Sequence, residues 1–299
     1  TATITASAEG LERATKAVTM EVTTWGACAP GPCEDTVAPP PYTLNFRGDH
    51  RQLADRAGVG TGFMYATAGT DADDFAENLQ VDMAGRGTLN VTTAGSALRG
   101  LADAPQSALA VGIDAPREPL VLTAVLQDPP GGFGSVEGAG LWYGADRDNL
   151  VKIRFVSTPG GPRIEYAAKS GGVATGRIVS EPPPRSSSAV ALRLRLNPAR
   201  GTIAADYSFN GGDYATLGLF AVPGLFFGEA GNPQRSGPRR FAGIFVTQGD
   251  AETPVVYRFD TFSVTEEAAA ITRGATQAPR LARTATRTSI ATSGPPPLC

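Results

Sequence analysis

The chain has 299 residues, of which 41% are hydrophobic, and this is enough to build the core of one large domain or two smaller ones. Its formal net charge is −3 and its acidic and basic residues are interspersed, which argues against nucleic acid as a partner. The 36 Gly and 24 Pro residues recur between short apolar runs, as in an all-β fold with many turns. No apolar run is long enough to predict a membrane span.

Residues 1–24 are predicted to form an N-terminal β arm. Residues 1–6 and 17–22 alternate between apolar and polar side chains, and a turn-like stretch at residues 10–13 separates them. The segment is similar to the last hairpin of a bacterial immunoglobulin-like repeat, but it is shorter than such a domain. We expect it to serve as an arm or as a strand that completes another sheet.

Residues 25–43 are predicted to form a Cys- and Pro-rich linker. Cys28 and Cys33 flank the turn sequence Ala-Pro-Gly-Pro, which favours a local disulfide and hence an oxidising compartment, although a pair of free thiols stays open. The spacing is not that of a zinc site. Cys299 is left over, and we expect it either to pair with another chain or a distant cysteine, or to be an exposed thiol.

Residues 44–265 are predicted to form the main domain, a two-sheet sandwich. In Leu150–Phe155 and in Ala191–Leu196, large apolar residues alternate with Lys or Arg, which predicts strands with one face in a core. The run Ile203–Phe209 ends at Asn-Gly, which predicts a tight hairpin turn. Residues 241–247 and 255–264 are predicted to be the last two strands.

Residues 266–299 are predicted to be a low-complexity tail. Residues 266–273 could form a short helix, and the remainder is rich in Ala, Thr, Arg and Pro without periodicity. If this tail is ordered, we expect its own domain or a neighbouring subunit to hold it. Because the chain begins at Thr1, we also expect it to be a processed form or part of a longer precursor.

Several segments of the main domain resemble a known family when they are taken together and in order. They are GVGTGFMYA (58–66), LQVDMAGRGTLNVTTAGSA (79–97), ALAVGIDAP (108–116), GAGLWYGADRDNLVKIRF (138–155), VALRLRL (190–196), IAADYSFNGGDYATLG (203–218), FAGIFVT (241–247) and FDTFSV (259–264). This pattern resembles the concanavalin A-like lectin/glucanase domains of secreted bacterial proteins, and it is similar to the accessory domains of some family 43 glycoside hydrolases. The resemblance implies an all-β, antiparallel jelly-roll sandwich.

The sequence predicts no catalytic residue. The Glu-x-Asp-x-Glu strand motif of the glucanase members is absent, and Glu137 and Glu165 have no neighbouring carboxylate, so we expect both on solvent-exposed faces. His50 is the only histidine, and no Gly-x-Ser-x-Gly elbow accompanies it. We therefore expect the chain not to be an enzyme. A carboxylate pair that only the fold brings together stays open as an alternative.

A structural calcium ion is a possible cofactor. The resemblance implies that such an ion would lie where the first and last strands of the sandwich meet, near Asp49, Asp55 and Asp260, because calcium prefers carboxylate and carbonyl oxygens. The alternative is that these residues are ordinary solvated acids.

Sugar binding is expected to use aromatic rings with an exposed face. The candidates are Trp142, Tyr143, Tyr166 and Tyr214, and Phe226 and Phe227 are further possibilities. Because adjacent residues on a strand point to opposite faces, one of Trp142 and Tyr143 should point out of the sandwich.

The preferred hypothesis is that the chain is a non-catalytic, carbohydrate-binding module of a secreted or cell-surface protein, with a glycan as its partner. The alternative hypothesis is that it is a structural or adhesive subunit of an extracellular assembly. In that case the arm, the tail and Cys299 would contact copies of the chain or other extracellular subunits.

Overall fold

The fold is known from a computed structural model. The structure describes residues 38–50, 53, 55, 58–67, 79–82, 87–92, 108–114, 116–130, 137–146, 148–182, 187–228, 239–247 and 255–267. All of these residues belong to one compact unit. The arm at 1–24, most of the linker with Cys28 and Cys33, and nearly all of the tail with Cys299 lie outside the described residues, so the predictions made for them stay predictions.

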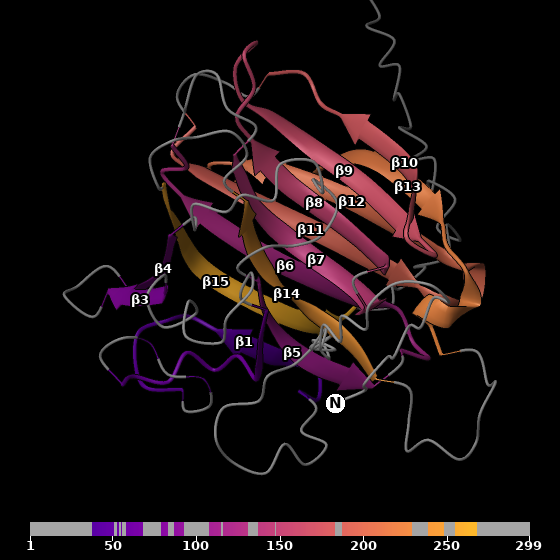
Figure 1. Cartoon of the computed structure of the whole chain (residues 1–299), viewed down its shortest axis with the longest axis horizontal. Helices are drawn as coiled ribbons and strands as arrows, with labels where there is room; N and C mark the ends of the chain where they lie inside the picture. Colours follow the sequence, from indigo (N-terminus) through magenta and orange to yellow (C-terminus); the bar gives the residue numbers. More distant parts are fainter. Residues whose placement is uncertain are drawn as a thin grey trace, which may run out of the picture. The chain divides into compact units, whose positions relative to one another are not determined.

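Two antiparallel sheets form the molecule, and Figure 1 shows their strands as two layers. The eight-stranded sheet has the order β13-β12-β11-β6-β15-β4-β3, and β1 also pairs with β15. Its strands are β1 (Tyr42–Leu44), β3 (Leu79–Asp82), β4 (Thr88–Thr92), β6 (Leu120–Gln127), β11 (Ala189–Asn197), β12 (Thr202–Phe209), β13 (Ala215–Ala221) and β15 (Val256–Glu266). The predicted all-β sandwich is therefore confirmed.

The seven-stranded sheet has the order β10-β9-β8-β7-β14-β5-β2. Its strands are β2 (Tyr65–Thr67), β5 (Ala108–Asp114), β7 (Gly138–Asp146), β8 (Asn149–Val156), β9 (Arg163–Ser170), β10 (Val173–Val179) and β14 (Arg239–Thr247). Two short 3-10 helices, η1 (Pro198–Arg200) and η2 (Gly224–Phe226), complete the secondary structure of the described residues. None of the described helices is long and apolar enough to cross a membrane.

Alternating side chains explain why these segments become strands. In β6 and β11, every second residue is a buried aliphatic residue and the residues between are partly exposed, so each strand contributes one face to the core. The inner faces of both sheets meet in one large hydrophobic cluster. The predicted strands at 150–155, 191–196, 203–209, 241–247 and 255–264 are all confirmed within one or two residues.

The turn between β12 and β13 is built as its sequence predicts. Asn210 and Gly211 have φ angles of 53° and 73°, a conformation that Asn tolerates and Gly adopts freely. The side-chain oxygen of Asn210 also accepts hydrogen bonds from the backbone N–H groups of Ser188 and Ala189, at 2.8 and 3.1 Å. This turn fixes where the chain re-enters the sheet at β13, directly after Tyr214.

Glycines on β7 leave no room for a side chain beside β8. A Cβ atom at Gly140 would lie 2.1 Å from the carbonyl oxygen of Ile153 and 2.7 Å from the Cβ of Arg154. We therefore expect Gly140→Ala to lower the free energy of unfolding by about 2 kcal/mol, because the backbone must shift to accept the methyl group. Urea denaturation measures this loss.

Gly160→Ala is the matched control for that substitution. Its Cβ atom would meet nothing closer than 3.7 Å, so this variant should unfold like the parent protein to within about 0.5 kcal/mol. Equal stability of the two variants would show that β7 and β8 are not packed as closely as described.

Candidate carbohydrate-binding surface

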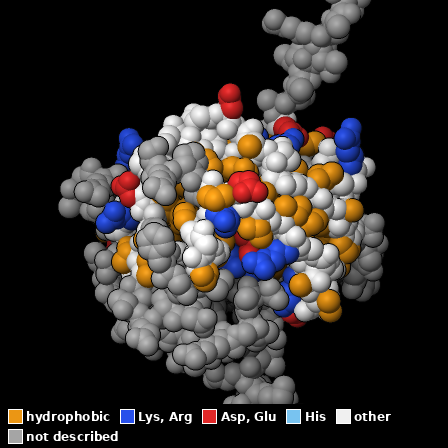
Figure 2. All heavy atoms as spheres, turned by 90° about the horizontal axis from the view of Figure 1, so that it is seen from above, with side chains coloured by type: hydrophobic (Ala, Val, Ile, Leu, Met, Phe, Trp, Pro, Cys, Tyr) orange, Lys and Arg blue, Asp and Glu red, His pale blue; other side chains and the backbone are white. Residues whose placement is uncertain are grey.

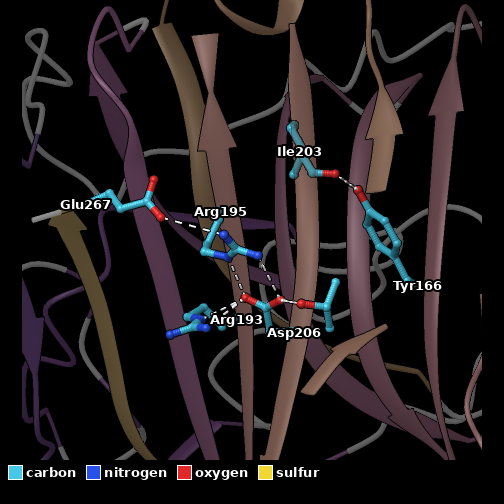
Figure 3. A network of polar contacts seen from close by, with 7 residues as sticks. Tyr166, Arg193, Arg195, Ile203, Asp206 and Glu267 are labelled. Carbon is cyan, nitrogen blue, oxygen red and sulfur yellow. Dashed lines mark hydrogen bonds and ion pairs between the residues drawn. The ribbon is translucent and has the colours of Figure 1, made fainter. Parts of the chain in front are cut away.

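Tyr143 and Tyr166, two of the predicted sugar-binding residues, are core residues. Both are 0% exposed. The Tyr143 hydroxyl donates a hydrogen bond to the carbonyl oxygen of Phe226 at 2.5 Å, and the Tyr166 hydroxyl donates one to that of Ile203 at 2.7 Å (Figure 3). The Tyr166 ring also stacks on Phe220, with centroids 4.3 Å apart. Both rings are packed inside the sandwich, so a sugar cannot stack on them.

Trp142 points out of the sandwich, as the alternation predicts, but it is also 0% exposed. It belongs to a second hydrophobic cluster on the outer face of the seven-stranded sheet, together with Leu150 and Phe245. Phe241 packs against this cluster, and its ring stacks with that of Trp142 at a centroid distance of 6.5 Å. Alternation thus predicted the direction of Trp142 correctly and its exposure wrongly.

The expected calcium ligands do not form a cluster among the described residues, where no three His, Cys, Asp or Glu side chains are grouped to hold a metal ion. The Asp55 carboxylate accepts a hydrogen bond from the N–H of Val59 at 2.8 Å, and that of Asp49 accepts one from Gly60 at 3.0 Å. Both therefore stabilise loop backbone. Asp260 lies on β15 and is partly exposed. Calcium binding stays a prediction.

A buried charged network lies on the outer face of the seven-stranded sheet. Glu165 on β9 accepts a hydrogen bond at 2.9 Å from Nε of Arg154 on β8 and one at 2.7 Å from Nε of Arg177 on β10. Arg154 also donates to the hydroxyl of Thr247 on β14 at 3.2 Å. Glu137 and Glu165 are each 3% exposed, so the expectation that both lie on solvent-exposed faces is wrong. The alternation of side chains along a strand shows which residues point to the outer face, but it does not show whether that face is buried in the folded chain.

Of the four main sequence candidates, Tyr214 is the one that keeps exposed surface, at 37%, and of the two further candidates Phe226 is buried and Phe227 is partly exposed. It precedes β13 on the outer side of the eight-stranded sheet, where the Asn210–Gly211 turn places it. The guanidinium carbon of Arg193 lies 3.7 Å from the centre of its ring, a cation–π contact that supports one face of the ring. Partial burial raises the pKa of Tyr214, so its hydroxyl stays protonated and able to donate a hydrogen bond at neutral pH.

Asp206 on β12 holds the arginine that supports this ring (Figure 3). It is 1% exposed, and its Oδ2 accepts hydrogen bonds from Nε of Arg193 at 3.0 Å and from Nε of Arg195 at 2.7 Å. Its Oδ1 accepts from Nη2 of Arg195 at 3.2 Å and from the hydroxyl of Thr216 at 2.8 Å. Burial alone would raise the pKa of Asp206, but these hydrogen bonds and the charge of Arg195 hold it below its ordinary value.

We call Arg193, Arg195, Asp206, Tyr214 and Thr216 the Tyr214 surface. Sequence reasoning found Tyr214 and missed the other four. The register of the pairing between β11 and β12 is the feature that would have identified them, because it places Arg193 directly opposite Asp206. Two arginines that alternate with leucines on β11 therefore flank a carboxylate on the next strand.

The Tyr214 surface combines a flat apolar ring with fixed polar groups. The side chains of Arg193 and Arg195 are 26% and 35% exposed, so both arginines keep contact with solvent. A ligand with both apolar C–H faces and many hydroxyl groups fits the Tyr214 surface. Figure 2 shows one face of the molecule, where hydrophobic side chains lie among polar atoms and basic side chains lie near acidic ones.

Comparison with solved structures places the fold beside GH43 proteins. The GH43 protein BlXynB from Bacillus licheniformis superposes with a TM-score of 0.54 at 15% sequence identity, over 75% of this chain and 39% of that one. An engineered GH43 glycoside hydrolase with both endo-xylanase and exo-arabinofuranosidase activity gives a TM-score of 0.54 at 17% identity, over 79% of this chain and 42% of that one. The chain thus spans about two fifths of each. No protein-family model and no curated protein matches the sequence.

These neighbours confirm the resemblance to the family 43 sandwich at the level of the fold. They also contradict the expectation that the chain is not an enzyme, since two solved structures with this fold are GH43 proteins and one of them is described as a glycoside hydrolase with two activities. That expectation rested on the absence of the glucanase motif and of a Gly-x-Ser-x-Gly elbow, and missing motifs do not exclude a different glycosidase chemistry.

Proposed function

We propose that this chain is the polysaccharide-binding sandwich of a secreted glycoside hydrolase and that it holds its substrate on the Tyr214 surface. The observation that carries the proposal is the exposed Tyr214 ring, which Arg193 supports from one side. Among the four sequence candidates, this is the ring with an exposed face, and Asp206 fixes the supporting arginine. A pre-positioned ring loses little conformational freedom when a sugar stacks on it.

Xylan-type polysaccharides are the first substrate class to test. One neighbour of the same fold is described as having both endo-xylanase and exo-arabinofuranosidase activity. The shared fold does not carry that activity over to this chain. It does indicate which sugars to offer first, and arabinoxylan presents both of the sugars that those two activities act on.

Tyr214→Ala should weaken arabinoxylan binding about ten-fold or more, the effect expected for an aromatic anchor at the centre of a binding surface. Tyr214→Phe keeps the ring and should bind within about two-fold of the parent protein. Isothermal titration with soluble arabinoxylan measures both affinities.

Thermal unfolding serves as the control, because Tyr214 lies outside the core and neither substitution should change the melting temperature by more than a few degrees. If the parent protein and Tyr214→Ala bind arabinoxylan equally well, the sugar lies elsewhere. If the parent protein binds no polysaccharide of a panel of xylans, galactans and glucans, the proposed function is wrong.

A further inference from the structure

Within the Tyr214 surface itself two guanidinium groups outnumber one carboxylate, and the second carboxylate, that of Glu267, lies beside Arg195. Arg193 and Arg195 bring two positive charges, and both surround the single carboxylate of Asp206. Asp206 is 1% exposed and both of its oxygens already accept hydrogen bonds, so the two arginines and Thr216 cover its negative charge. The outer N–H groups of the two guanidinium groups are left as the groups that a ligand meets.

Arg195 has a further partner, Glu267, but the contact between them is weak. Its Nη1 lies 3.7 Å from Oε1 of Glu267, which is beyond hydrogen-bond distance, and the two side chains are 35% and 38% exposed (Figure 3). A solvated pair of this kind contributes little to stability. Glu267 therefore sits where the carboxylate of a ligand would sit, and it can be displaced.

We propose that the Tyr214 surface selects acidic polysaccharides, with the carboxylate of a uronic acid replacing Glu267 on Arg195. Nε and Nη2 of Arg195 bind Asp206, so its Nη1 is the nitrogen nearest to Glu267 and the donor that a ligand carboxylate would meet. Arg193, which supports Tyr214, and Arg195 donate to the same oxygen of Asp206, so their guanidinium groups are adjacent and one sugar can stack on the ring while a neighbouring sugar reaches Arg195. This inference rests on the proposed function and names the class of its substrate.

Glu267→Gln provides the test, because it removes the competing carboxylate. The backbone N–H of Glu267 donates to the carbonyl oxygen of Pro119 at 2.9 Å, and glutamine keeps that bond, so the chain should stay in place. We expect affinity for glucuronoxylan to rise about three-fold and affinity for neutral arabinoxylan, which has the same backbone, to stay unchanged. Added salt should weaken only the binding of glucuronoxylan.

Glu266→Gln is the matched control, since it removes the same charge from the preceding residue, which is exposed. It should change neither affinity by more than about 1.5-fold. If the parent protein binds both xylans equally well and Glu267→Gln changes neither affinity, the acidic-ligand inference is overturned and the proposed function stands. If neither xylan binds to the parent protein or to the variants, both fail.

Discussion

Replacing Glu165 by alanine is expected to lower the free energy of unfolding by about 3 kcal/mol. The side chain of Arg154 is 4% exposed and its Nη2 lies 2.8 Å from Oε1 of Glu165, so the substitution leaves a buried guanidinium without its carboxylate. The hydrogen bond from Arg154 to Thr247 remains but cannot neutralise the charge. Urea denaturation of the two proteins at pH 7 measures the loss.

The effect of pH on this loss has a definite sign. Burial alone would raise the pKa of Glu165, but the charge of Arg154 and the hydrogen bonds from Arg177 and Arg154 outweigh it and hold the pKa below 4.5. A carboxylate whose pKa is lower in the folded state stabilises the fold above its unfolded pKa, and this contribution is lost as the pH falls through the lowered value. The parent protein should therefore lose stability in acid more steeply than Glu165→Ala.

Arg177→Ala is the matched control for Glu165. The side chain of Arg177 is 62% exposed, and its removal leaves the buried pair of Arg154 and Glu165 intact, so the loss of stability should be much smaller. If Glu165→Ala is as stable as Arg177→Ala, the network on the outer face of the seven-stranded sheet is solvated rather than buried.

Replacing Asp206 by alanine is expected to lower stability by about 2 kcal/mol and also to weaken polysaccharide binding. The stability loss should be smaller than at Glu165, because Arg193 and Arg195 are about one quarter and one third exposed and can be solvated by water. Binding should weaken because Arg193 loses the hydrogen bonds that keep it under the Tyr214 ring. Urea denaturation and titration with arabinoxylan measure the two effects.

A double-mutant cycle separates these two roles of Asp206. If Asp206 acts on binding only through the ring, Asp206→Ala should cause almost no further loss of affinity in a protein that already carries Tyr214→Ala. If the two residues act independently, the affinity losses of the two single variants should add in the double variant. Asp206→Asn is the matched variant, because it keeps the shape and one acceptor oxygen, and it should lie between the parent protein and Asp206→Ala in stability. Full additivity of Asp206→Ala and Tyr214→Ala in binding would contradict the supporting role of Arg193.

Local patterns were sufficient to predict several of the strands and the faces of those strands that enter the core. The alternation in β11 and the Asn210–Gly211 turn each specify a conformation through nearby residues alone, and both are found as expected. The resemblance of several segments to family 43 sandwiches also predicted the two-sheet arrangement.

The candidate site was only partly predictable, because burial depends on what covers a face and not on the strand itself. Trp142 and Glu165 both point outward as alternation requires, yet both are buried. Pairing of Arg193 with Asp206 requires the register between β11 and β12, which neither strand specifies alone. Tyr214 was one of the four candidates, and only the folded chain shows that its ring is exposed whereas the other three rings are buried.

The most direct test of polysaccharide binding at Tyr214 is to map the contact by NMR. The side-chain Nε–H signals of Arg193 and Arg195 and the ring signals of Tyr214 report on this surface, and the indole N–H of Trp142 reports on the opposite sheet. Saturation with a xylo-oligosaccharide should shift the first three and leave Trp142 unchanged. Shifts confined to Trp142, or no shifts at a sugar concentration that saturates binding, would contradict the assignment of the site.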